Sequence, residues 1–186
     1  MRASLRLKVF PLLLGATLSG CVNSEVSQNG GGRTDVNMQA AADRADLILD
    51  AVLEKIHPQI QWAHDPTTVG KCDVSRRRTV MTIISADRRG SFLGVVERFW
   101  RESGYQIKAI NSDVDLPAVY AQTDDGFGVS LSVGGKGQAF FQVDSPCVAK
   151  SDVADSTTSP NGPSYEGVYP LPRPNIRSPF WSAGAP

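Results

Sequence analysis

The chain has 186 residues, with 19 Lys and Arg against 19 Asp and Glu, and a formal net charge of zero at pH 7. This balance argues against a nucleic-acid or other polyanionic partner and against purely electrostatic attachment to a membrane. The length suits one domain with extensions at its ends.

The first twenty residues have the parts of an export signal. Arg2, Arg6 and Lys8 precede an apolar run over residues 9–18, and small residues then lead to Cys21. A run of this length is too short for a transmembrane helix, which needs roughly 20 apolar residues. We therefore expect residues 1–20 to be a signal peptide, whose removal leaves the acidic residues in slight excess.

The segment Leu18-Ser19-Gly20-Cys21 resembles the lipobox of bacterial lipoproteins. The combination of signal, tether and one compact domain with the segment Phe99-Trp100-Arg101-Glu102-Ser103-Gly104-Tyr105 also resembles uncharacterised actinobacterial lipoproteins. The resemblance implies that Cys21 Sγ carries a diacylglyceryl group and that the protein is lipid-anchored on the extracytoplasmic face of the cell membrane. It implies no activity. The alternative is an ordinary secretory signal that leaves Cys21 unmodified.

Once Cys21 is assigned to lipid, Cys72 and Cys147 remain as a pair. Two thiols outside the cytoplasm usually oxidise, so we predict a disulfide between them. The alternatives are two free buried thiols, or metal ligands assisted by His57 or His64. Metal sites normally contain closely spaced Cys or His pairs, which the sequence lacks, so we expect no metal and no cofactor.

Residues 21–33 are rich in Asn, Ser, Gln and Gly and predict a flexible tether. A helix is expected over residues 35–56, because apolar residues recur at helical spacing and the residue before Pro58 cannot stay helical. The pattern places Asp43, Asp46, Asp50 and Glu54 on the solvent side. The acidic polar face favours a helix that packs on a core over one that lies on lipid.

A polar connector is expected over residues 59–78, before a strand over residues 79–84. Its basic run, Arg76, Arg77 and Arg78, is expected in solvent at the entrance to this strand, with contact to anionic headgroups or wall polymers as the alternative. A second helix follows and ends at Gly104, which suits a left-handed C-cap. Its apolar stripe comprises Phe92, Val95, Val96, Phe99 and Trp100.

From Tyr105 the apolar period becomes two, which predicts strands over residues 105–110, 118–122, 127–133 and 139–143. Hairpin turns are expected over residues 124–126 and 134–137. The order predicts an α+β domain over residues 34–150, in which two helices pack on one face of a mostly antiparallel four- to five-stranded sheet.

Residues 151–186 are rich in proline and poor in aliphatic residues, and we expect a disordered, Pro-rich tail. The segment Pro170-Leu171-Pro172-Arg173-Pro174 is similar to a proline-rich docking peptide, with a flexible spacer as the alternative. Tyr165, Tyr169, Phe180 and Trp181 are the residues through which the tail could dock.

Three motifs fail on closer inspection. Gly134-Gly135-Lys136 lacks the earlier glycine and the following helix of a phosphate loop. Asn111, Asp113 and Asp115 begin like a calcium loop, but Leu116 occupies the glycine position. Residues 128–132 fail as a nucleophile elbow at the last position.

The sequence contains no catalytic constellation, and we expect no catalytic residue. The leading hypothesis is a non-enzymatic binding or accessory module attached to the membrane through Cys21, with a possible cell-wall or protein partner and no nucleic acid. The alternative is an exported hydrolase that uses carboxylates such as Asp124 and Asp125, or one of His57 and His64. A deep cleft in which His64 and a carboxylate converge would favour the hydrolase, whereas isolated histidines on a shallow surface would favour binding.

Overall fold

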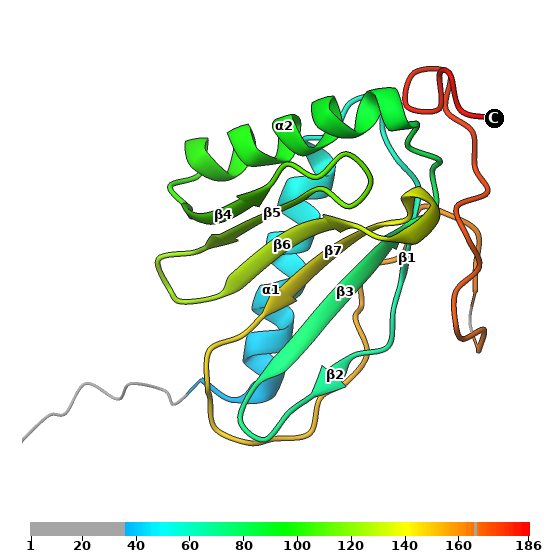
Figure 1. The fold of residues 1–186 in the computed structure, drawn as a ribbon. Coiled ribbons are helices and arrows are strands. Elements are labelled where there is room, and N and C mark those ends of the chain that lie inside the picture. Colours follow the sequence, from blue (N-terminus) through cyan, green and yellow to red (C-terminus); the bar gives the residue numbers. More distant parts are fainter. Residues whose placement is uncertain (1–35, 166) are drawn as a thin grey trace, which may run out of the picture. The chain divides into compact units, whose positions relative to one another are not determined.

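The computed structural model describes residues 36–165 and 167–186 (Figure 1). The predicted signal peptide, Cys21 and the predicted tether lie outside these residues. The described part of the chain, including the C-terminal tail, falls within one compact unit.

The fold is built on an antiparallel sheet of seven strands. Along the sheet the order is β1-β3-β7-β6-β5-β4, and β2 pairs with β3 beside this path. The strands are β1 (Trp62–His64), β2 (Thr68–Val69), β3 (Val74–Val80), β4 (Gln106–Asn111), β5 (Ala118–Gln122), β6 (Gly128–Val133) and β7 (Ala139–Asp144).

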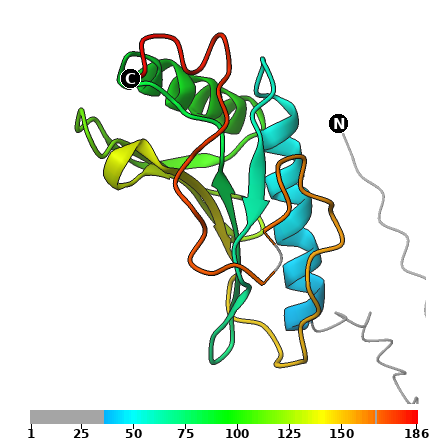
Figure 2. The same cartoon turned by 90° about the vertical axis from the view of Figure 1, so that its right-hand side faces the viewer.

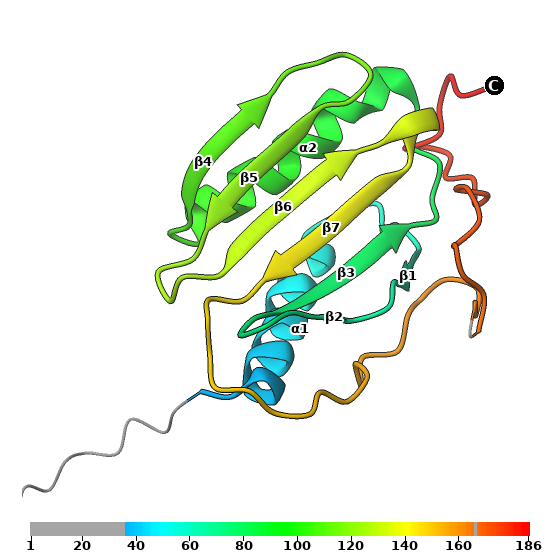
Figure 3. The same cartoon turned by 60° about the horizontal axis from the view of Figure 1, so that its bottom comes forward.

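Both helices lie on one face of this sheet, and Figure 3 shows the opposite face with the helices behind it. Helix α1 (Met38–Glu54) contacts β3 and β7, and helix α2 (Ala86–Glu102) contacts β4 and β5. Asn37 caps α1 by accepting a hydrogen bond from the Ala40 amide at 2.9 Å. Gly104 follows α2 with φ +82°, as its C-cap position predicts.

The core fills the space between the helices and the sheet. Every second side chain of each central strand points toward the helices. In β6 the inward residues Val129, Leu131 and Val133 are at most 3% exposed. The α2 residues Phe92, Val96 and Trp100 are at most 1% exposed and face them from the other layer. The α+β class and the antiparallel sheet are therefore confirmed.

The sheet is larger than the predicted four to five strands. Strand β3 spans Val74–Val80, so the basic run lies inside a central strand and the strand ends before Met81. The predicted connector also contains β1 and β2. The prediction that this run lies in solvent is wrong for Arg76 and Arg78, which are 3% and 0% exposed. Both side chains point toward α1, where they pair with Asp46 and Asp50.

The expectation of a disordered C-terminal tail is also wrong. Residues 151–165 and 167–186 run along α1 and the β1 edge of the sheet (Figure 2). The Trp181 side chain is 1% exposed and its Nε1 donates to the Pro58 carbonyl at 2.6 Å. Ile176 forms a backbone bridge with Thr82. The low apolar content of the tail did not predict this docking, because polar side chains and backbone groups of the tail also hydrogen-bond to the rest of the domain.

The sulfur atoms of Cys72 and Cys147 lie at disulfide distance, with their Cα atoms 4.8 Å apart, as predicted. The bridge joins the turn between β2 and β3 to the segment that follows β7. A hydrogen bond from the Val148 amide to the Cys72 carbonyl, at 2.7 Å, lies beside it.

Candidate functional site

The face of the sheet that the helices leave uncovered is the candidate site, and we call it the open face. Side-chain alternation places polar and aromatic residues on it. In cross-strand register, Arg77 of β3 lies beside Gln142 of β7, which lies beside Ser130 of β6 and then Tyr120 of β5. The neighbouring rows add Ser75, Asp144, Gly128 and Gln122, and Phe140 and Ser132.

Arg77 is the cation at the centre of one hollow on the open face. Its guanidinium carbon lies 4.2 Å from the centroid of the Phe140 ring, within the range of a cation–π contact. The nearest carboxylate is that of Asp65, with 4.0 Å between Arg77 Nε and Asp65 Oδ2. Arg77 Nε is buried and has no hydrogen-bond partner among the described residues, while the side chain as a whole is 41% exposed.

The carboxylates near Arg77 are already engaged by neighbouring side chains. Asp65 accepts a hydrogen bond from Thr79 Oγ1. Asp144 accepts hydrogen bonds from Ser75 Oγ and, at 2.8 Å, from Gln142 Nε2. These bonds hold the carboxylates in place, while the guanidinium keeps hydrogen-bonding capacity that the described protein atoms do not use.

Three hollows lie next to one another here and share lining residues. The one at Arg77 has a volume of about 350 Å³ and is walled by Thr68, Ser75 and the Tyr169 ring of the tail. Gln142 also lines a hollow of about 390 Å³ over β5 and β6. Tyr169 and Asp65 also line a hollow of about 520 Å³ between β1 and the tail. The surface therefore combines hydroxyl, amide and aromatic groups over an extended area.

The hollow between β1 and the tail contains His64, one of the hydrolase candidates. His64 Nε2 lies 2.7 Å from the carbonyl oxygen of Thr158, and its ring packs edge-on against Trp62 at 5.0 Å. Asp65 lines the same hollow, but its carboxylate bonds to Thr79. The histidine and this carboxylate have separate partners and do not form a pair.

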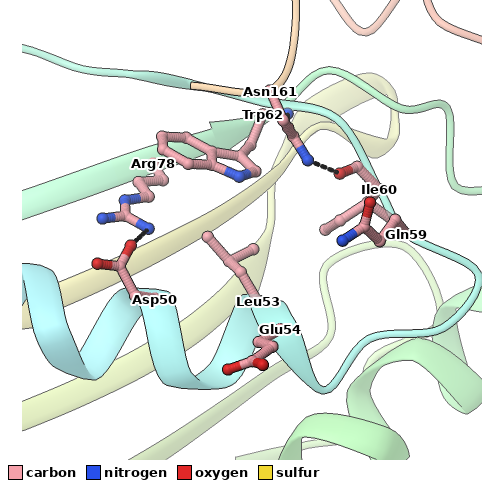
Figure 4. Close-up of a pocket in the computed structure, with 8 residues that line it drawn as sticks. All are labelled: Asp50, Leu53, Glu54, Gln59, Ile60, Trp62, Arg78 and Asn161. Atoms are coloured by element: carbon pink, nitrogen blue, oxygen red, sulfur yellow. Dashed lines mark hydrogen bonds and ion pairs between the residues drawn. The ribbon is translucent and has the colours of Figure 1, made fainter. Parts of the chain in front are cut away.

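A fourth hollow, of about 230 Å³, lies on the helix side of the sheet (Figure 4). Asp50 pairs with Arg78 there, at 2.6 Å between Oδ1 and Nη1. Asn161 donates to the Ile60 carbonyl at 3.0 Å and accepts from the Trp62 amide at 3.2 Å. Asp50 thus pairs with Arg78, and Asn161 with the backbone of Ile60 and Trp62, and we interpret this hollow as part of the structural framework.

The buried arginines of β3 form the centre of that framework. Arg76 Nε lies 3.3 Å from Asp46 Oδ2, and the Arg76 guanidinium donates to the Ala154 carbonyl of the tail at 2.7 Å. Arg78 lies 4.2 Å from the Trp62 ring centroid. The predicted outward position of Asp46 is wrong, since it is 8% exposed, and Asp50 is half-buried. Charged groups enclosed in this way must stay paired.

The acidic turn predicted as a possible hydrolase site lies away from this network. Asp124 is exposed, and Asp125 Oδ2 pairs with Arg44 Nε of α1 at 3.0 Å. Burial opposes ionisation of Asp125, but hydrogen bonds from Thr123 and Arg44, together with the Arg44 charge, outweigh it and lower the pKa of Asp125. Burial raises the pKa of nearby Tyr105. This arrangement stabilises the ionised form of Asp125.

The remaining sequence candidates are scattered. His57 is exposed after α1, and Cys21 lies outside the described residues. Asn111 and Asp113 cap a loop, where Asp113 Oδ1 accepts the amides of Asp115 and Leu116 at 2.9 and 2.8 Å. Over residues 36–165 and 167–186, no group of three or more His, Cys, Asp or Glu side chains is placed to hold a metal ion.

The sequence analysis considered Arg77 only as one of three residues in a solvent-exposed basic run, and Tyr169 only as a residue through which the tail could dock, and it assigned neither to a binding site. The alternation in Val-Ser-Arg-Arg-Arg-Thr-Val is a signal that separates Arg77 from its two neighbours, since only one side of a strand can face α1. The spacing of Asp46 and Asp50, one helical turn apart, could have indicated that two of the three arginines face them. The aromatic character of Tyr169 indicated that it could dock, but no comparable signal indicated that it lies beside Arg77.

In the part of the chain that the structure describes, no helix is both long and apolar enough to cross a membrane. No protein-family model matches the chain. Searches of curated proteins and of solved structures likewise find no match.

Proposed function

We propose that the protein is a non-enzymatic binding module, anchored by lipid on Cys21 to the extracytoplasmic face of the cell membrane, which presents the open face of its sheet to a polar component of the envelope. One observation carries the binding role. Among the described residues, no helix covers this face of the sheet, which bears engaged carboxylates, hydroxyls and amides around Arg77, whose side chain is 41% exposed.

The anchor and the location rest on the sequence. The lipobox-like segment ending at Cys21 and the basic and apolar residues before it support export and lipidation. Two acyl chains would hold the protein stably, since each buried CH₂ contributes about 0.8 kcal/mol. The cysteine pair at disulfide distance is consistent with an oxidising compartment.

The hydrolase alternative receives no specific support from the geometry. His64 is bonded to a backbone carbonyl, and Asp125 is bonded to Arg44. A general base needs a carboxylate or histidine within hydrogen-bond reach of a substrate proton, oriented by a third group. Neither residue is placed in such an arrangement.

Lipidation is tested by metabolic labelling with a clickable fatty acid. The wild-type chain should carry label and the Cys21→Ala variant should carry none. Equal label in both proteins would refute the anchor.

Binding is tested with the chain from residue 21 onward, made soluble by Cys21→Ser, mixed with isolated cell envelopes of a bacterium that produces it. Ser130→Trp places a large ring on the open face, and Arg98→Trp places the same ring on the exposed side of α2 as a matched control. We expect the first change to abolish co-sedimentation and the second to leave it intact. Equal binding by both variants, or no binding by the parent chain, would refute the proposal.

A further inference from the structure

The hollow at Arg77 has features that define the chemistry of a ligand more narrowly. The guanidinium carbon lies 4.2 Å from the centroid of the Phe140 ring, and this cation–π contact restrains the guanidinium before a ligand arrives. Its nearest carboxylate oxygen is 4.0 Å from Nε, beyond hydrogen-bond distance, and that oxygen already accepts from Thr79. Arg77 therefore offers a preorganised fork of donors on the open face.

A guanidinium fork matches a carboxylate or phosphate in a planar, two-bond contact. The surroundings favour the carboxylate. Asp65 and Asp144 flank Arg77 on the same face and would repel a dianion more strongly than a monoanion. The chain as a whole carries no excess of positive charge, so an isolated carboxylate fits better than a polyanion.

The groups around the guanidinium suit a hydroxyl-rich ring. Ser75 and Gln142 both donate and accept hydrogen bonds, and the Asp144 carboxylate can accept them from ligand hydroxyls. Tyr169 stands at the wall and is 73% exposed, so its ring can cover the apolar side of a sugar. The volume of about 350 Å³ is at the lower end of the range for small-ligand sites.

An extended peptide fits this face less well. A peptide that binds a sheet adds a strand to an open edge. Arg77 lies on β3, whose backbone already pairs with β1 and β2 on one side and with β7 on the other. Recognition here must therefore come from side chains, which are the groups that read saccharide hydroxyls.

We propose that the hollow at Arg77 binds a sugar unit that bears one carboxylate, with Arg77 holding the carboxylate and Ser75, Gln142 and Asp144 holding hydroxyls. This inference rests on the proposed function, because it names the ligand class of the same open face. Tyr169 would stack on the ring of the sugar.

The test uses the chain from residue 21 onward with Cys21→Ser, and NMR titration with three probes. Methyl glucuronide and methyl glucoside differ only in the carboxylate, and acetate supplies the carboxylate without the sugar. We expect the glucuronide to bind at least about tenfold more tightly than either of the others, the gain of a charge-assisted pair, with the largest shifts at Arg77 and Gln142.

Substitution then assigns the preference to Arg77. Arg77→Gln should remove the discrimination between glucuronide and glucoside, and Arg77→Lys should retain only part of it, because lysine lacks the fork. Arg98→Gln on α2 is the matched control, and thermal unfolding of each variant establishes that it is folded.

Each outcome decides the inference separately from the proposed function. Equal binding of glucuronide and glucoside, unaffected by Arg77→Gln, overturns the carboxylate role. Acetate binding as tightly as glucuronide overturns the sugar. If none of the probes binds, the inference fails, while envelope binding that is lost in Ser130→Trp and kept in Arg77→Gln would leave the proposed function standing.

Discussion

Trp181 is the residue on which docking of the C-terminal tail depends most strongly, and Trp181→Ala tests this. The side chain is 1% exposed. Its ring packs edge-on against Phe92 and Phe180, with centroids 5.4 and 4.8 Å away. Its Nε1 also donates to the Pro58 carbonyl. Truncation would leave a cavity beside the core of α2 and remove the partner of that carbonyl.

Substitutions of this type cost about 3–5 kcal/mol. In a domain of about 150 residues, each kcal/mol lowers the melting temperature by about 2–4 °C, so we expect a decrease of about 6–20 °C. Circular dichroism during heating measures it, and urea unfolding gives the free energy. Trp181→Phe keeps most of the buried ring and should cost less than Trp181→Ala.

Leu47→Ala is the matched control, because Leu47 lies on the outer side of α1 and is 61% exposed. It should change the melting temperature little. If Trp181→Ala also lowered it by less than about 4 °C, the tail would not be an integral part of the fold. A chain ending at Lys150 should be less stable still, since it also loses the tail groups that bond to Arg76 and Asp50.

Three further predictions concern the framework. Arg78→Leu should destabilise the fold by about 3–5 kcal/mol in urea unfolding, because it removes the buried cation that pairs with both Asp46 and Asp50. Arg98→Leu on the exposed side of α2 should have little effect, and equal losses would refute the role of the buried pairs. Replacing Cys72 and Cys147 together by serine should lower the free energy of unfolding by about 4 kcal/mol, the value that the chain-entropy model gives for a sequence separation of 75. An unchanged midpoint of urea unfolding would contradict this. Folding lowers the pKa of Asp125, so its ionised carboxylate stabilises the fold above the unfolded pKa of about 3.9, and this stabilisation is lost as the pH falls through the folded pKa. The difference in unfolding free energy between the wild type and Asp125→Asn should therefore shrink below about pH 4. A difference that grows there would show that folding raises this pKa instead.

The sequence predicted those parts of the fold in which burial follows a simple period. The alternation over residues 127–133 identified β6, and the helical stripe of Phe92, Val96 and Trp100 identified α2. Gly104 was predicted to end the second helix because glycine readily adopts the left-handed conformation, and its positive φ confirms this.

The remainder could not be predicted, because its burial depends on partners distant in sequence. Arg76 and Arg78 are inside only because Asp46 and Asp50 meet them across the layer. The tail is fixed by hydrogen bonds such as that from Thr158 to Asp50, at 3.0 Å, which composition does not record. The open face was missed for the same reason, since Arg77 is distinguished from its neighbours only by the side of β3 on which it lies.

If the chain is held by its N-terminal end, as proposed above, the cysteine pair has a mechanical consequence. Val36 and Met38 bond to the backbone of Ala149, at 3.1 and 3.0 Å, so a force applied through the chain ahead of Val36 reaches this short bridge first. While this bridge holds, it passes part of the load to Ala149 and along the backbone to Cys147. There the covalent bond to Cys72 transfers the load to the hairpin of β2 and β3, which pairs with the centre of the sheet. The cysteine pair would thus act as a stop against unravelling under tension, a role separate from its effect on equilibrium stability.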